Sequence, residues 1–238
     1  MAEVHEIADG IYRIATFVPQ ANMTFTQFLI ADDAPLLFHT GQRALFPETL
    51  GGIRKVIDPA RLRHISWSHL EADECGALNE FLNIAPRAQP VQGQVGVMVG
   101  VSDFSTRPVQ AMQDNDVLDL GRHKLRFLVT PHVPHAWDAI LLYEETTGTL
   151  FTSDLFTQSG TCGPLTKSDV VGLAVEALKK YPDYLPIGQH TGRVFDRLEA
   201  LNPKVLAGHH SPTFTGDAVQ ALRDLRQALF APLTEAPA

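Results

Sequence analysis

The chain has 238 residues, 45% of them hydrophobic and 19% charged, with a formal net charge of −8. This composition is typical of a globular protein with a large core, so we expect a single domain over residues 1–238 with a short flexible tail at 232–238. The negative charge without a basic cluster argues against a nucleic-acid partner. The chain also lacks an apolar run long enough for a signal peptide or a membrane span, which predicts a cytoplasmic protein with no membrane association.

The first half of the chain is predicted to consist mainly of strands. Residues 4–18 predict a β-hairpin, because apolar residues alternate on both sides of Asp9-Gly10. Further strands are predicted at 24–30, 36–38 and 63–67, and helices at 47–56 and 75–83. The Val- and Leu-rich stretch 91–128 predicts several more strands separated by turns.

In the second half the apolar spacing changes from that of strands to that of helices. Residues 139–143 and 149–152 predict a hairpin across Thr147-Gly148. Three helices then follow: one capped by Ser168 and ended by Pro182, one around 194–201 and one after Asp217, with a short strand at 204–207 between the last two.

The order of the elements indicates the fold class. Strands come in two batches, each followed by helices, and no glycine-rich turn opens a helix after the first strand, which disfavours a dinucleotide-binding fold. Two sheets packed face to face with helices outside satisfy the pattern. No long linker divides the chain, in agreement with one domain.

A dense cluster of polar residues lies between a predicted strand and a predicted helix. In an extended chain, residues two apart point the same way, so His69, Glu71 and Asp73 can present one imidazole and two carboxylates to a single pocket. The alternative is that Asp73 or Glu74 only caps the helix that follows, where carboxylates are favoured.

Three further strand ends carry residues of the same types. His132 and His135 follow the predicted strand that ends near Leu128, Asp154 follows the second strand of the hairpin, and His209 follows the strand at 204–207. Loops at strand ends are common positions for functional groups. Four junctions that each deliver His, Asp or Glu therefore predict a metal site.

The order of these residues resembles the metallo-β-lactamase fold over nearly the whole chain. More narrowly, it is similar to the core of flavodiiron proteins and of the related oxygen-binding diiron proteins (ODP). That family has His-x-Glu-x-Asp followed by a His, a bridging Asp and a final His, which His69, Glu71, Asp73, His135, Asp154 and His209 match. The resemblance implies an αββα four-layer sandwich of two mixed sheets with helices outside.

The resemblance also implies a role for each ligand. His69, Glu71 and His135 are expected to hold one metal, Asp73 and His209 the other, and Asp154 to bridge them. Glu74 departs from the family, which often has His at that position, so Glu74 is expected to complete the second metal, to act through a water or only to cap the helix. Catalytic roles are assigned to Asp154, Glu71 and Glu74.

Other residues are expected to support the ligands. His39, His132 and His210 are predicted to lie behind the ligands and orient them, although a loop histidine in contact with solvent is the alternative for the last two. Trp67 and Trp137 are expected to pack beneath the site. The two cysteines, Cys75 and Cys162, are too few for a disulfide framework and are predicted to be free thiols.

The carboxylate-rich ligand set predicts iron. Hydrolytic relatives of this fold usually have His where Glu71 stands, and carboxylates add hard oxygen donors that favour a pair of iron ions over zinc, with manganese and zinc left open. The resemblance therefore implies a diiron oxidoreductase that binds or reduces dioxygen or nitric oxide. A zinc hydrolase of esters, thioesters or lactones, and a metal-stabilised binding module without turnover, are the alternatives.

The electron supply is expected to be separate from this chain. Flavodiiron proteins carry an FMN domain after the core, whereas this sequence ends soon after His209 and has no rubredoxin-like cysteine pairs. We therefore expect no FMN domain in the chain, a separate electron-donor protein or the neighbouring subunit of a homo-oligomer as the electron source, and O2 or NO as the small ligand.

Overall fold

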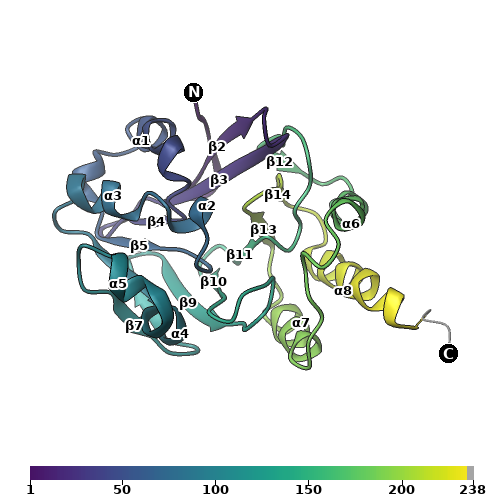
Figure 1. Cartoon of the computed structure of the whole chain (residues 1–238). Helices are drawn as coiled ribbons and strands as arrows, with labels where there is room; N and C mark the ends of the chain where they lie inside the picture. Colours follow the sequence, from purple (N-terminus) through teal and green to yellow (C-terminus); the bar gives the residue numbers. More distant parts are fainter. Residues whose placement is uncertain (235–238) are drawn as a thin grey trace.

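The protein is a sandwich of four layers, two β-sheets between two layers of helices (Figure 1). The computed structural model describes residues 1–234; the expected tail falls partly on the end of the last helix, and its residues 235–238 lie outside the described residues. The αββα architecture predicted from the sequence is confirmed.

The first sheet contains seven strands in chain order, antiparallel from β1 to β4 and parallel from β4 to β7. Its strands are β1 (Glu3–Ala8), β2 (Ile11–Val18), β3 (Met23–Ile30), β4 (Leu36–Phe38), β5 (His64–Ser66), β6 (Gln89–Gly93) and β7 (Gln110–Met112).

The second sheet has the order β12-β14-β13-β11-β10-β9-β8, with β11 and β13 parallel. Its strands are β8 (Val117–Asp119), β9 (Lys124–Val129), β10 (Ile140–Glu144), β11 (Thr149–Ser153), β12 (Leu165–Thr166), β13 (Val205–Gly208) and β14 (Thr213–Phe214).

The helices lie on the two outer faces. Those of the first half are η1 (Arg43–Leu45), α1 (Phe46–Ile53), η2 (Pro59–Arg61), α2 (Ala72–Cys75), α3 (Leu78–Ile84), α4 (Gln94–Gly96), the π-helical turn η3 (Val97–Val101) and α5 (Ser102–Phe104). Those of the second half are α6 (Val171–Lys180), α7 (Thr191–Ala200) and α8 (Ala218–Thr234). Figure 1 shows α1 and α3 on one side of the sheets and α6, α7 and α8 on the other. None of the helices in residues 1–234 has the length and apolar character needed to cross a bilayer.

Alternation along the strands explains the layers. On β10, Leu141 faces the helices α6–α8 while Ile140 and Leu142 face the other sheet, because successive side chains of a strand point to opposite faces. Between the sheets, Phe151 of the second sheet contacts Phe28 and Phe38 of the first, with ring centroids 5.1 and 5.4 Å apart. These aromatic contacts fix the sheets face to face.

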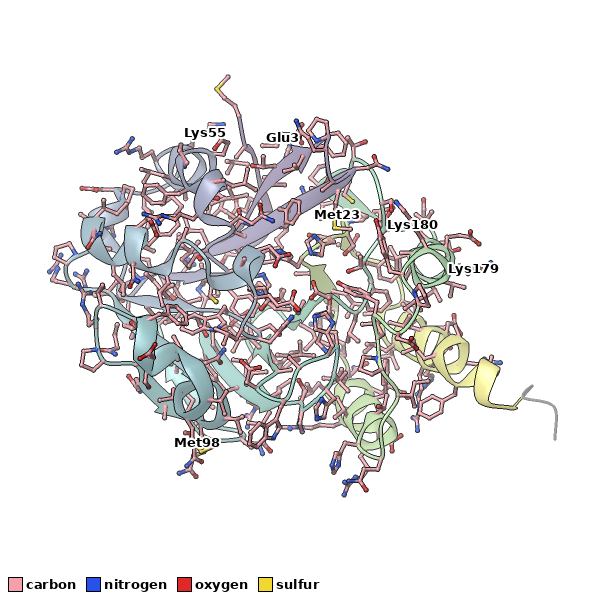
Figure 2. The ribbon with its side chains drawn as sticks, viewed as in Figure 1. Glu3, Met23, Lys55, Met98, Lys179 and Lys180 are labelled. Carbon is pink, nitrogen blue, oxygen red and sulfur yellow. The ribbon has the colours of Figure 1, made fainter. Side chains whose placement is uncertain are left out.

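Three local predictions were wrong. Residues 94–104 form α4, η3 and α5 rather than strands, because Val97 and Val101 recur at helical spacing and pack on the core while Met98 projects into solvent (Figure 2). The helix predicted at 75–83 is instead two short helices, α2 and α3. The carboxylate of Asp169, not Ser168, accepts the first amide hydrogens of α6.

A buried pair of hydrogen-bonded side chains links two turns at one edge of the sandwich. His123, before β9, lies with its Nδ1 2.8 Å from Asp32 Oδ2 and its Nε2 2.9 Å from the carbonyl of Asp9. Burial would raise the pKa of Asp32, but bonds from the His123 backbone and ring and from the Asp33 amide lower it to about 2.

We predict that Asp32→Asn lowers the free energy of unfolding by about 2 kcal/mol at neutral pH. Because the folded pKa lies below the unfolded one, the ionised carboxylate stabilises the protein above the unfolded pKa, and this contribution is lost as the pH falls toward about 2. Urea unfolding of both proteins should therefore show a difference that shrinks between about pH 5 and pH 3. A difference independent of pH would contradict this account.

Candidate metal centre

The ends of five strands meet at one edge of the sandwich. Strands β4 and β5 of the first sheet are parallel, and β9, β11 and β13 of the second sheet also run in one direction. The residues that follow these strands therefore emerge at the same edge. They include His39 after β4, His69 after β5, His135 after β9, Asp154 after β11, and His209 and His210 after β13.

Several of these turns use a backbone conformation that non-glycine residues rarely adopt. His39, Ala136 and Ser153 have φ values of 63°, 65° and 48°, in the left-handed region. Such conformations cost about 1–3 kcal/mol each and persist only where the surrounding structure enforces them. At these three positions the chain turns sharply, and the polar side chains beside it face one another.

Four residues form what we call the first ligand group: His69, Glu71, His135 and Asp154. His135 Nε2 lies 3.1 Å from Glu71 Oε1 and 3.5 Å from Asp154 Oδ2. His69 Nε2 lies 3.6 Å from Glu71 Oε1 and 3.5 Å from Asp154 Oδ2. Ligand atoms about 2.1 Å from one metal ion are about 3.0–3.5 Å apart, so these separations suit a shared cation.

Three residues form the second ligand group: Asp73, His209 and His210. Asp73 Oδ2 lies 3.2 Å from His210 Nε2 and 3.6 Å from His209 Nε2. His210 Nε2 is also 3.5 Å from Asp154 Oδ1, whereas the other oxygen of Asp154 faces the first group. Asp154 thus reaches both groups, one oxygen to each.

The prediction for His210 needs correction. The sequence suggested His209 as the ligand and His210 as a supporting residue, but the structure places the Nε2 atoms of both in the second group. Strand alternation does not distinguish them, because both lie in the turn after β13 ends. Each group consequently has two imidazoles and one carboxylate of its own, together with Asp154.

Two other predicted positions are also corrected. The His132 side chain is exposed, and within residues 1–234 it belongs to neither ligand group. Trp67 is fully buried in the core cluster of the first sheet and its helices, and Trp137, expected to pack beneath the site, is 54% exposed. The chain turns at Ala136, directly before this exposed residue.

Glu74 lies behind the ligands instead of among them. Its side chain is buried, accepts hydrogen bonds from the His69 backbone N–H and the Ser153 hydroxyl, and belongs to neither group. His39, expected to lie behind the ligands, is also buried, with its Nδ1 2.7 Å from Nδ1 of His209. The sequence contained no signal for Ser153, because its role depends on a contact 79 residues away.

The site is lined by aromatic side chains that the sequence analysis did not identify. The Tyr184 ring lies 5.0 Å from the His135 ring, and its hydroxyl lies 3.0 Å from that of Thr157. The rings of Phe25 in β3 and His210 are nearly perpendicular, with their centroids 5.0 Å apart. The site opens on the side of Glu71, whose side chain is 46% exposed, whereas His69 and His209 are fully buried.

The electrostatics of the site call for positive charge. Burial alone would lower the pKa of His69, yet the nearby Glu74, Glu71 and Asp154 raise it to about 10. Burial likewise opposes protonation of His210, but Asp73 and Asp154 raise its pKa. His135 and His69 lower the pKa of Glu71 to about 2. Protons on the imidazoles thus balance the carboxylates, a balance that metal cations would supply instead.

Unpartnered atoms show where cations fit. His69 Nε2, His209 Nε2 and Asp154 Oδ1 are buried without a hydrogen-bond partner, although buried polar atoms are nearly always paired. All three face the interior of a ligand group. The residues present therefore fit two metal ions that share the Asp154 carboxylate.

A surface cavity lies away from the two ligand groups. It has a volume of about 610 Å³ between α7 and α8, where Arg223 and Arg226 line it. Both guanidinium groups are paired with acidic side chains of α7, Arg223 with Glu199 and Arg226 with Asp196 and Glu199. The two arginines that line it are thus already paired.

A four-layer αββα sandwich with two linked His and carboxylate groups at one sheet edge defines the metallo-β-lactamase class of fold. A sequence profile described as "ODP family beta lactamase" matches residues 23–211. The chain belongs to this family.

The chain is similar in sequence to proteins named as flavo-diiron proteins and diflavin flavoproteins. The chain is 26% identical to flavo-diiron protein FprA2 of Clostridium acetobutylicum over 235 residues, which covers 91% of this chain and 58% of that protein. It is 33% identical to diflavin flavoprotein A 1 of Synechocystis over 143 residues, covering 58% of this chain and 24% of that protein. The chain thus spans little more than half of FprA2.

Solved structures share the fold. Rubredoxin oxygen:oxidoreductase of Desulfovibrio gigas superposes with a TM-score of 0.84 at 21% identity, covering 95% of this chain and 62% of that one. Fragment 1–254 of putative diflavin flavoprotein A 5 from Nostoc superposes with a TM-score of 0.82 at 16% identity, covering 98% and 97%.

We predict that His210→Ala reduces the metal content from two ions per chain to one, because it removes a ligand from the second group and leaves the first group whole. The loss of affinity at the second position should exceed the 10- to 100-fold typical of a residue behind a ligand. Metal analysis after dialysis measures the content, with His132→Asn as a control, since Asn tolerates the left-handed conformation at that exposed position. Two tightly held ions in His210→Ala would contradict the assignment.

Proposed function

We propose that the chain is a non-haem diiron protein that binds dioxygen or nitric oxide, and reduces the bound molecule when a separate protein supplies electrons. The observation that carries this proposal is the position of Asp154. Its two oxygens face different ligand groups, each with two imidazoles and a carboxylate of its own. A shared carboxylate is how two-metal sites hold their ions about 3.5–4 Å apart.

The donor types favour iron over zinc. Glu71, Asp73 and Asp154 supply three carboxylates, which are hard oxygen donors, whereas zinc prefers nitrogen and sulfur. The thiol of Cys75, close to Glu71 in the chain, offers no alternative ligand. Burial raises the pKa of Cys75 to about 12, and its Sγ donates to the carbonyl of Glu71 instead of entering a ligand group.

Two bound ferrous ions would supply two electrons to a diatomic molecule on passing to the ferric state. The protein contributes shape and access. Glu71 and His135 lie at the open side of the site, where a small molecule can enter. Tyr184 and Phe25 wall it with aromatic surface, which suits an uncharged gas better than a charged substrate.

Electrons must come from elsewhere, because full reduction of dioxygen to water takes four electrons and four protons. The D. gigas relative is named as an oxidoreductase between rubredoxin and oxygen, which supports a small redox protein as the donor. The flavin named in the other relatives supports an alternative route through a flavoprotein subunit or a neighbouring copy in a homo-oligomer.

The proposal predicts iron-dependent oxygen consumption. Protein loaded with ferrous iron without air should hold two iron ions per chain and take up substoichiometric dioxygen with a change in its visible spectrum. Addition of reduced rubredoxin should then give several turnovers, measured with an oxygen electrode. Asp154→Ala should abolish both iron binding and oxygen uptake, whereas His132→Asn should behave as the unchanged protein.

Two results would contradict the proposal. One is less than one iron ion per chain after loading. The other is turnover of thioesters or lactones by the zinc-loaded protein while the iron-loaded protein leaves dioxygen untouched, which would instead indicate a hydrolase.

A further inference from the structure

Glu74 occupies a position between the two ligand groups. It lies in α2 with a fully buried side chain, and its two oxygens face different neighbours. Oε2 accepts the backbone N–H of His69 at 2.6 Å and lies 3.3 Å from the Nδ1 atom of the same residue. Oε1 accepts the Ser153 hydroxyl at 2.6 Å and lies 3.5 Å from Nε2 of His39.

His39 extends this contact to the second ligand group. Its Nδ1 lies 2.7 Å from Nδ1 of His209, so exactly one of the two nitrogens carries the shared proton. Because His209 directs Nε2 toward Asp73, a neutral His209 that binds metal through Nε2 must carry its proton on Nδ1 and donate it to His39. The proton of neutral His39 then lies on Nε2, the atom that faces Glu74.

The same assignment holds on the other side. His69 directs Nε2 toward Glu71 and Asp154, so its Nδ1 carries the proton and faces Glu74 Oε2. One carboxylate therefore faces the N–H side of a ligand histidine in each group, directly for His69 and through His39 for His209. Outer carboxylates of this kind fix the tautomer and ring orientation of metal-bound histidines.

We propose that Glu74 is a single positioning residue for both metals, neither a ligand nor a helix cap, and that His39 transmits its effect to the second metal. This inference rests on the proposed two-metal site. The ligand alternative is disfavoured because Glu74 contributes to neither group. The capping alternative is disfavoured because both oxygens accept from groups outside the helix, the His69 backbone N–H before α2 and the Ser153 hydroxyl at the end of β11.

Two substitutions test the direct contact of Glu74 with His69 and its contact with His209 through His39 separately. Glu74→Gln keeps the volume but replaces one oxygen with an NH2 group, so it can no longer accept on both sides. We expect this substitution to lower the affinity for each of the two metals by about 10- to 100-fold. His39→Asn should lower the affinity for the second metal by a similar factor and leave the affinity for the first unchanged. Asn is chosen because it tolerates the left-handed backbone conformation at this position.

Glu144→Gln is the matched control. Glu144 is equally buried, and its carboxylate accepts hydrogen bonds from Thr146 and Thr147 in the turn between β10 and β11, so its substitution tests the loss of a buried carboxylate as such. We expect it to lower stability and to leave both metal affinities unchanged.

The experiment is a chelator-competition titration of each full-length protein with Co²⁺, followed by the visible spectrum of each bound ion, with circular dichroism to verify folding. Unchanged affinities in Glu74→Gln, or equal weakening in Glu144→Gln, would overturn the proposal. A loss of affinity for both metals in His39→Asn would also overturn the proposal. If Glu74→Gln does not fold, the selective loss in His39→Asn decides.

The outcomes distinguish this inference from the proposed function. Failure of the unchanged protein to bind two ions would remove the two-metal site and this inference with it. Two ions in the unchanged protein with the predicted losses in the variants, but no reaction of the iron form with oxygen, would leave the role of Glu74 intact and remove only the proposed function.

Discussion

Close packing of carboxylates at one sheet edge is the constraint on which the rest of the site depends. The carboxylates of Asp154 and Glu74 are buried there, beside the partly buried Asp73 and the exposed Glu71, and negative charges so close together are costly unless cations or protons balance them. Two ligand groups that share Asp154 offer each cation both imidazole nitrogen and carboxylate oxygen. The same carboxylate charge would bind the metals.

The fold holds this arrangement in place from both sheets. Phe28, Phe38 and Phe151 pack between the sheets and fix their separation. Because β4 and β5 belong to one sheet and β9, β11 and β13 to the other, ligands from both sheets reach a common point only when that packing is intact. Stability of the core and geometry of the site are therefore coupled, although no core side chain is a ligand.

Much of this could be predicted from residue order. The alternation of apolar residues indicated the strands, and polar residues directly after strands indicated which side chains would meet, as for His69, Asp154 and His135. Where periodicity was ambiguous the prediction failed: valines at 97 and 101 fit a strand as well as a helix until their packing is known. The adjacent pair His209 and His210 was likewise ambiguous, because turn geometry and not alternation directs both inward.

Contacts between distant residues were beyond reach of the sequence. The link from Ser153 through Glu74 and His39 to His209 joins four separate segments, and none of its members stands at a distinctive spacing from the others. The central claim, two metals that share Asp154, is tested most directly by anomalous X-ray diffraction at the iron edge from anaerobically loaded crystals. The account predicts two peaks, one beside His69 and His135 and one beside His209 and His210, on either side of Asp154. A single peak, or peaks away from Asp154, would contradict it.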